Sequence, residues 1–169
     1  MTTHSKMVIS GGALLVAVAA GMVVTPSAEE TNATFQGVWQ TLEVVVPAVP
    51  GRTFRPDATL AIFHGRHYSR VEVHADQPRP LLANPAAASA DQLRAAWGPF
   101  VAEAGTFDVN GRDLITMRAT VAKNPAAMRD GASSIYRYRR EGDRLTLTEI
   151  STPAGPSAQP IVVTLRHIE

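Results

Sequence analysis

The run Phe35-Gln36-Gly37-Val38-Trp39 decides the fold, and a strand-like stretch over residues 40–46 follows it directly. The first strand must bend sharply if a β-sheet is to close into a barrel, and Gly37 permits that bend because it has no side chain. The indole of Trp39 can then plug one end, and the guanidinium of Arg166 can stack on its face. This stretch therefore predicts a closed antiparallel barrel whose first and last strands are neighbours.

From residue 35 onward, short segments of alternating apolar and polar residues are separated by strong turn signals. Asn110-Gly111 between two such segments, for example, is typical of a β-hairpin. We expect an all-β chain, an eight-stranded antiparallel up-and-down barrel with one inserted helix after strand 3. The expected strands cover residues 37–46, 60–63, 67–73, 105–109, 114–121, 134–140, 145–150 and 161–168.

The inserted helix begins with a capping box, in which Ser89 is the N-cap and Gln92 stands at the third helical position. Apolar residues then follow at helical spacing as far as Ala104. We expect a helix over residues 90–104, either continuous or broken at Gly98-Pro99. Its apolar face should pack against one mouth or flank of the barrel, because the opposite face is charged. This face comprises Leu93, Trp97 and Phe100.

Composition divides the chain into three parts. Residues 1–28 combine a short polar start, an apolar stretch over residues 7–24 and small residues before Glu29, as in a signal peptide or an N-terminal anchor. Residues 29–34 are a linker, and residues 35–169 are the barrel domain. Export to the periplasm or the medium is therefore expected. The chain contains no Cys, which excludes a lipoprotein, disulfides and Cys-based zinc sites.

The charge balance excludes one class of partner. Lys and Arg number 16 against 15 Asp and Glu, so the chain has no electrostatic footprint for nucleic acid. Contact with a membrane is expected only through the N-terminal segment, if that segment is not cleaved. We expect a monomer.

Several stretches, in this order, are similar to the bacterial lipocalin-like domain family. The resemblance covers residues 35–168 and implies an eight-stranded calycin-type barrel, without catalytic residues to transfer. The stretches are Gly37-Val38-Trp39-Gln40, Leu60-Ala61-Ile62-Phe63, Gly65-Arg66-His67-Tyr68-Ser69, Gly105-Thr106-Phe107-Asp108-Val109, residues 141–148 and Leu165-Arg166.

Glu43 is the first candidate for a site in the lumen. It stands two pleats from Trp39 and so points to the same face of a regular strand. It can serve as a polar anchor or a general base, or it can pair with an arginine. A β-bulge would instead turn it outward. The candidate arginines are Arg118, Arg137 and Arg139.

Tyr136 and Tyr138 share one strand face, where they either hydrogen-bond a ligand or form the wall. Trp97 is a candidate lid residue. The candidate ligand-binding residues are Trp39, Glu43, Tyr136, Tyr138 and Trp97, and the structural signature is Gly37, Trp39 and Arg166. No metal is expected, because the histidines do not form a set of converging ligands. No catalytic residue and no cofactor is expected either. The histidines considered are His64, His67 and His74.

Three functions fit these observations. The first is an exported, non-catalytic barrel that binds a small apolar or amphipathic molecule in its lumen. The second is an isomerase or cyclase-type enzyme that uses Glu43 or a tyrosine for proton transfer. The third is an interaction or inhibitor module with a filled core.

Overall fold

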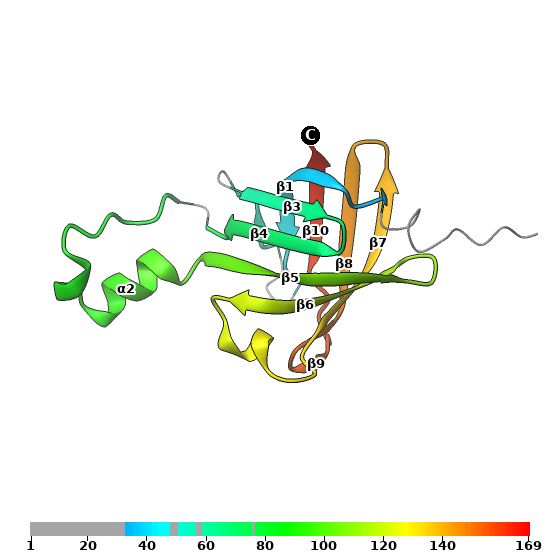
Figure 1. Cartoon of the computed structure of the whole chain (residues 1–169). Coiled ribbons are helices and arrows are strands. Elements are labelled where there is room, and N and C mark those ends of the chain that lie inside the picture. Colours follow the sequence, from blue (N-terminus) through cyan, green and yellow to red (C-terminus); the bar gives the residue numbers. More distant parts are fainter. Residues whose placement is uncertain (1–32, 48–50, 57–58, 76) are drawn as a thin grey trace, which may run out of the picture.

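The computed structural model describes residues 33–47, 51–56, 59–75 and 77–169. The expected signal segment therefore lies outside the described residues. Eight long strands and two strands of two residues form one antiparallel sheet in these ranges, which confirms the all-β prediction (Figure 1). The strands are β1 (Gly37–Val45), β2 (Thr53–Phe54), β3 (Thr59–His64), β4 (His67–Val73), β5 (Phe100–Asn110), β6 (Leu114–Ala122), β7 (Ser134–Glu141), β8 (Arg144–Thr152), β9 (Gly155–Pro156) and β10 (Val162–His167).

The sheet closes on itself. The strand order is β10-β1-β3-β4-β5-β6-β7-β8, and β10 pairs with β8 as well as with β1. Each long strand otherwise pairs with its neighbour in the chain, as in an up-and-down barrel. The fold is therefore a lipocalin-like, calycin-type barrel, as the resemblance implied.

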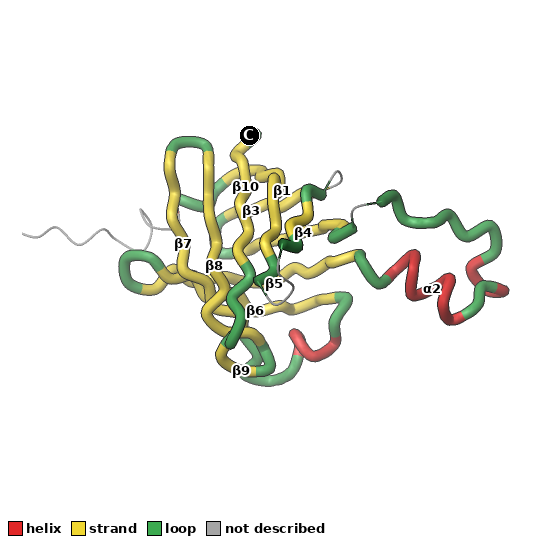
Figure 2. The backbone as a smooth tube through the Cα atoms, turned by 180° about the vertical axis from the view of Figure 1, so that it is seen from behind, coloured by secondary structure: helices red, strands yellow, loops and turns green. Residues whose placement is uncertain are grey.

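The two ends of the barrel differ. Tight turns at Gly65, Gly111 and Gly142 gather at one end, together with residues 33–36, whose Gln36 exchanges hydrogen bonds with Gly65. We call this the closed end. The long connections that follow β1, β4, β6 and β8 lie at the other end, which we call the open end (Figure 2).

The apolar core fills the closed end. The ring of Phe35 is fully buried, and its centroid lies 5.6 Å from that of Phe63, 5.7 Å from that of Phe107 and 4.8 Å from that of Tyr138. These residues converge because alternate side chains of a strand point to the same face. The segment before β1 is therefore held as a plug in the closed end.

β1 contains a bulge. Its register against β10 shifts between Thr41 and Glu43, and the buried positions of the strand change from Trp39 and Thr41 to Val44. A bulge adds one residue to a strand and so reverses the faces beyond it. Glu43 points away from the lumen for this reason.

The helix α2 covers Ala90–Trp97 and begins at the predicted capping box on Ser89. The prediction that it continues to Ala104 is wrong, because β5 begins at Phe100 and pairs with β4 from there. Pro99 accounts for the change, because a proline has no N–H to donate to the carbonyl oxygen of Ala95 and its ring clashes with that turn of a helix. Two short 3₁₀ helices, η1 (Pro85–Ala87) and η2 (Pro125–Met128), lie in the connections at the open end.

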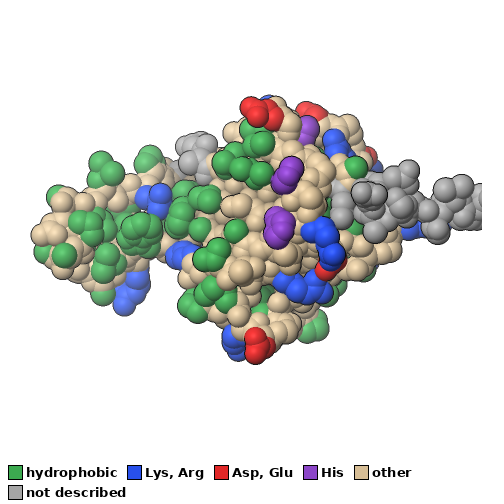
Figure 3. Space-filling model, in the orientation of Figure 1, with side chains coloured by type: hydrophobic (Ala, Val, Ile, Leu, Met, Phe, Trp, Pro, Cys, Tyr) green, Lys and Arg blue, Asp and Glu red, His purple; other side chains and the backbone are tan. Residues whose placement is uncertain are grey.

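Residues 77–99 form an arm that projects from the open end and carries exposed hydrophobic side chains (Figures 1 and 3). Trp97 is 51% exposed and Leu93 is 36% exposed, so the prediction that this helix face packs against the barrel is wrong. Lys123 holds the base of the arm, because its ammonium group donates hydrogen bonds to the carbonyl oxygens of Trp97, Gly98 and Phe100. None of the helices in the described ranges is long and apolar enough to cross a membrane.

Gly37 should be difficult to replace. Its φ of +115° lies in a region that side chains disfavour, and a Cβ at this position would overlap the backbone oxygen of Glu169 and the ring of His167. Gly111 has a φ of +65° but open space around it. We expect Gly37→Ala to lower the free energy of unfolding by about 1–3 kcal/mol more than Gly111→Ala, which is the cost of overpacking. Urea denaturation of both variants checks this, and equal losses would contradict the close contact at Gly37.

Candidate functional site

The inward face of β4 and its extension is polar. Tyr68, Arg70, Glu72 and His74 stand at alternate positions and therefore point to the same side. Tyr68 and Glu72 are buried, whereas the intervening Val71 is exposed on the outer wall. One strand thus directs two charged side chains, a phenol and an imidazole into the lumen.

Glu72 is the most deeply buried of these polar groups, at 1% exposure. His74 Nε2 lies 2.7 Å from Glu72 Oε2 and donates a hydrogen bond to it, and Arg70 Nη1 lies 4.0 Å from Glu72 Oε1. Burial acts to raise the pKa of Glu72, but the hydrogen bond from His74 and the charge of Arg70 outweigh it, so the pKa is below its ordinary value. Glu72 is therefore an ionised carboxylate at neutral pH.

Glu103 from β5 stands directly opposite Arg70 in the sheet. Arg70 Nε lies 2.9 Å from Glu103 Oε1, and the hydroxyl of Tyr68 donates to the same oxygen over 3.3 Å. Burial acts to lower the pKa of Arg70, but Tyr136 and Glu103 outweigh it and raise the pKa. Burial and the charge of Glu103 raise the pKa of Tyr68. Arg70 is therefore charged at physiological pH, and Tyr68 and Tyr136 are neutral phenols.

Tyr136 and Glu149 add the far wall of the lumen. They stand opposite each other on β7 and β8, and Tyr136 is 5% exposed. Burial raises the pKa of Tyr136, and the charge of Glu149 adds to this although Arg70 opposes it. Ser157 Oγ donates to Glu149 Oε1 over 2.7 Å. We call this set the lumen cluster; it comprises Tyr68, Arg70, Glu72, His74, Glu103, Tyr136 and Glu149.

Phe54 from β2 lies over the cluster at the open end. It is 5% exposed, and its ring stacks on that of His74 with centroids 6.1 Å apart. The guanidinium of Arg52 lies 4.4 Å from the centroid of Phe54. This stack covers His74, whose side chain is nevertheless 28% exposed. The rim of the open end thus combines an aromatic ring with a cation.

Two buried polar atoms lack a hydrogen-bond partner in the described part of the chain, Thr41 Oγ1 and Arg70 Nε. Arg70 Nε approaches Glu103, but not at the angle of a hydrogen bond. Thr41 lies on β1. Its hydroxyl helps to lower the pKa of Glu72, although the two groups do not meet the geometry of a hydrogen bond. Unpaired buried groups are costly in a folded protein, so a molecule that bonds to them would be stabilised here.

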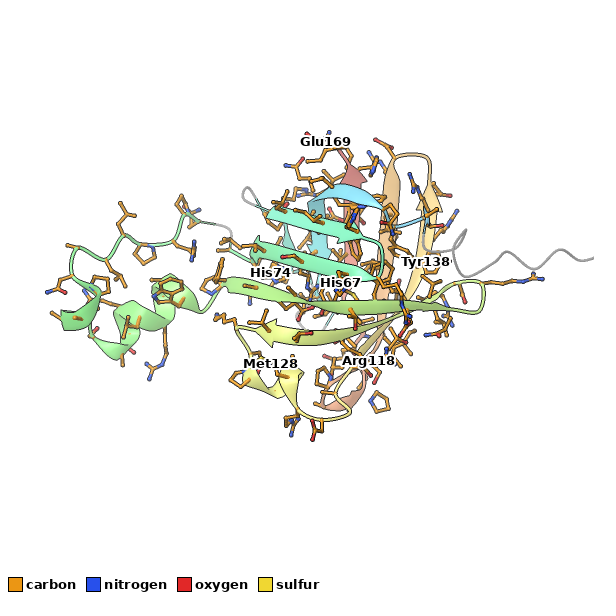
Figure 4. The ribbon with its side chains drawn as sticks, viewed as in Figure 1. His67, His74, Arg118, Met128, Tyr138 and Glu169 are labelled. Atoms are coloured by element: carbon orange, nitrogen blue, oxygen red, sulfur yellow. The ribbon has the colours of Figure 1, made fainter. Side chains whose placement is uncertain are left out.

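The structure separates the five predicted ligand-binding residues. Tyr136 lies in the lumen cluster. Trp39 and Tyr138 lie at the closed end, where the indole Nε1 of Trp39 donates to the carbonyl oxygen of Phe35 over 2.7 Å. Figure 4 shows His74 toward the end from which the arm leaves and Tyr138 toward the opposite end. Trp97 lies on the arm.

Glu43 does not reach the lumen. It lies on the outer surface and pairs with Arg55 at 3.0 Å, with side chains 35% and 76% exposed. The prediction that it shares the face of Trp39 is wrong, and the bulge beyond Thr41 is the reason. The outward alternative is the one that the structure shows, and the partner is none of the three arginines proposed from the sequence.

The predicted stacking of Arg166 on Trp39 is also wrong. Arg166 stands opposite Gln40 and donates to its side-chain oxygen over 2.8 Å on the outer surface, whereas His167 stands opposite Trp39. The guanidinium over the indole belongs to Arg140, 5.2 Å from the ring centroid. Arg140 also donates to the carbonyl oxygen of Thr34 and so ties the segment before β1 to β7.

The sequence contained a signal for the charged residues that were missed. Arg70 and Glu72 alternate with Ser69 and Val71 within a strand that was predicted. Both faces of that strand therefore carry polar residues, which is unusual for a strand that covers an apolar core. No group of three or more His, Asp or Glu residues in the described ranges could hold a metal ion.

Comparison with known proteins gives similarity of fold only. No protein-family model and no curated protein matches the chain. Among solved structures, a lipocalin-like protein from Bacteroides uniformis ATCC 8492 is similar, with a TM-score of 0.47 and 12% identity over 80% of this chain and 99% of that chain. An uncharacterized protein from Bacteroides eggerthii DSM 20697 gives 0.44 and 12% over 79% and 99%. A redesigned β-barrel gives 0.45 and 10% over 82% and 95%.

Proposed function

We propose that the barrel binds a small amphipathic molecule at the open end of its lumen and does not react with it. The lumen cluster is the observation that carries this proposal. Burying charged groups costs several kcal/mol each unless they are well paired, and a barrel core can be built without them. Such groups on the inner wall, beneath the mouth, are the polar fixing points of a typical ligand site.

The surroundings of the cluster suit a molecule with an apolar part. Phe54 lies over the cluster, and Val46 and Ile161 at the ends of the neighbouring strands pack partly buried against the core. An apolar group can rest on these side chains at the rim while its polar head reaches the lumen cluster. The closed end is filled by aromatic rings and leaves its residues no such role.

The same geometry favours binding over proton transfer. A general acid or base works best with a pKa near the operating pH, whereas the surroundings of Glu72 hold its pKa below the ordinary value. Glu43, the carboxylate that an isomerase-type reaction was expected to use, lies outside the lumen.

Fluorescence titration with N-phenyl-1-naphthylamine, a neutral amphipathic probe, tests the proposal. We expect saturation at one probe per chain. Tyr136→Phe should weaken binding roughly two- to tenfold, because the variant loses the hydroxyl that accepts a hydrogen bond from the probe's N–H group, worth about 0.5–1.5 kcal/mol. Tyr138→Phe is the matched control two residues along the strand and should bind like the wild type. Absence of saturable binding, or equal effects of the two substitutions, would refute a lumen site at the open end.

A further inference from the structure

We propose that the lumen prefers amphiphiles whose head is a primary ammonium group over those with a carboxylate or a hydroxyl head. This proposal rests on the proposed function, since it names the ligand class of the same site. Three observations support it: the excess of carboxylates in the lumen cluster, the lack of a cationic partner for Glu149 in the described ranges, and a buried hydroxyl without a hydrogen-bond partner there.

The lumen cluster has more carboxylates than cations. Glu72, Glu103 and Glu149 face one guanidinium, that of Arg70, and one imidazole, that of His74. Glu72 is engaged by His74 and Arg70, and Glu103 is engaged by Arg70 and Tyr68. Even with His74 protonated, the carboxylates outnumber the cations by one. A cationic head group would neutralise the remaining negative charge of the cluster, whereas an anionic head group would add to it.

Glu149 is the carboxylate without a cation. Its hydrogen bond comes from the hydroxyl of Ser157, and no basic side chain in the described ranges forms an ion pair with it. Tyr136 stands directly opposite it. An ammonium group placed here can bond to the carboxylate and lie against the phenol ring, which attracts cations. Glu149 and Tyr136 therefore form the expected head-group site.

A second observation points to a ligand independently of charge. The hydroxyl of Thr41 is 1% exposed, lies on the inward face of β1 and has no hydrogen-bond partner in the described part of the chain. A hydroxyl offers two acceptor lone pairs, and a primary ammonium supplies three donors. A carboxylate head supplies no donor at neutral pH and a hydroxyl head supplies one. Arg70 Nε, the other unpartnered buried atom, is a donor, but it already lies 2.9 Å from the carboxylate of Glu103. The hydroxyl of Thr41, beside Glu72, is therefore the acceptor that remains, and a primary ammonium supplies the donors for it.

Displacement of N-phenyl-1-naphthylamine by three amphiphiles of equal chain length tests this preference. The three are dodecylammonium, dodecanoate and dodecanol, each kept below its micelle concentration. We expect dodecylammonium to displace the probe at a concentration at least tenfold lower than dodecanoate does. Non-specific adsorption should show no such order, because the formal net charge of the whole chain is only +1 and attracts neither head group strongly.

Two substitutions of glutamate by glutamine distinguish binding in the lumen from binding to the outer surface. Glu149→Gln should reduce the preference for ammonium at least severalfold, whereas Glu43→Gln, on the outer wall, should leave it unchanged. Equal or stronger displacement by dodecanoate, or equal effects of the two substitutions, would overturn the inference and leave the proposed function standing. A probe that binds but is displaced by none of the three would overturn the inference as well. A probe that does not bind at all would instead refute the proposed function.

Discussion

Trp39→Ala should lower the free energy of unfolding of the barrel by roughly 3–5 kcal/mol, the range for removing a large buried aromatic side chain. Trp39 has no exposed surface, and it joins three elements at the closed end. Its indole Nε1 donates to the carbonyl oxygen of Phe35, its ring packs against His167 with centroids 4.7 Å apart, and Arg140 lies over its face. The truncation would therefore leave a cavity and an unpaired carbonyl oxygen together.

The second tryptophan of the chain is a matched control. Trp97 lies on the arm and is 51% exposed, so we expect Trp97→Ala to cost less than about 1 kcal/mol. Trp39→Phe should fall between the two, because the ring is kept while the hydrogen bond to Phe35 is lost. Urea denaturation followed by far-ultraviolet circular dichroism measures all three variants. Similar losses for the two alanine variants would mean that the closed end does not limit the stability of the barrel.

The closure of the barrel could be predicted because its signals are local. Gly37 and Trp39 mark the first strand, and Asn110-Gly111 marks a hairpin whose geometry depends on two residues. The position of Trp39 in the core followed from alternation along one strand. Such features require no knowledge of which distant segments meet.

Which residues contact Trp39, and which point into the lumen, depends on the register between neighbouring strands, and this register cannot be read from the sequence. Arg166 and His167 are adjacent, and only the pairing of β10 with β1 decides which of them faces the indole. One bulge beyond Thr41 likewise exchanged the faces of β1 and placed Glu43 outside. The buried carboxylate was Glu72 instead, on a strand without a bulge.

The sequence contains a signal for the end of the helix, Pro99, but the prediction gave more weight to an apolar spacing that continues beyond it. Phe100 and Ala104 continue the apolar spacing of α2, and this spacing favoured a helix as far as residue 104. Gly98 still has helical backbone angles, but Pro99 has no N–H with which to continue the helical hydrogen bonds. The chain instead gains a ladder of hydrogen bonds by pairing β5 with β4 from Phe100 onward. Sheet pairing therefore won over helical periodicity, and Trp97 was left on the exposed arm.

Arg70→Met should destabilise the barrel at neutral pH by roughly 3–5 kcal/mol, as expected when one partner of a buried ion pair is removed. The substitution keeps much of the side-chain volume but leaves Glu72 and Glu103 without a guanidinium between them. The matched control is Arg55→Met. Arg55 lies 3.0 Å from Glu43, close to the 2.9 Å between Arg70 and Glu103, but its pair is on the surface. We expect it to cost less than about 1 kcal/mol.

The pH dependence of this loss distinguishes an electrostatic cause from a packing defect. In the wild type the pKa of Glu72 is below its ordinary value of 4.5, so its stabilisation is present above about pH 4.5 and is lost as the pH falls toward the folded-state pKa. Without Arg70 the burial of Glu72 is less opposed, its folded-state pKa rises, and acidification penalises the variant less. The difference in stability between wild type and Arg70→Met should therefore be constant near pH 7, shrink once the pH falls below the raised folded-state pKa of Glu72 in the variant, and be smallest at pH 4. Urea denaturation at each pH measures it; a difference independent of pH would show that Arg70 stabilises the barrel by its volume and not by its charge.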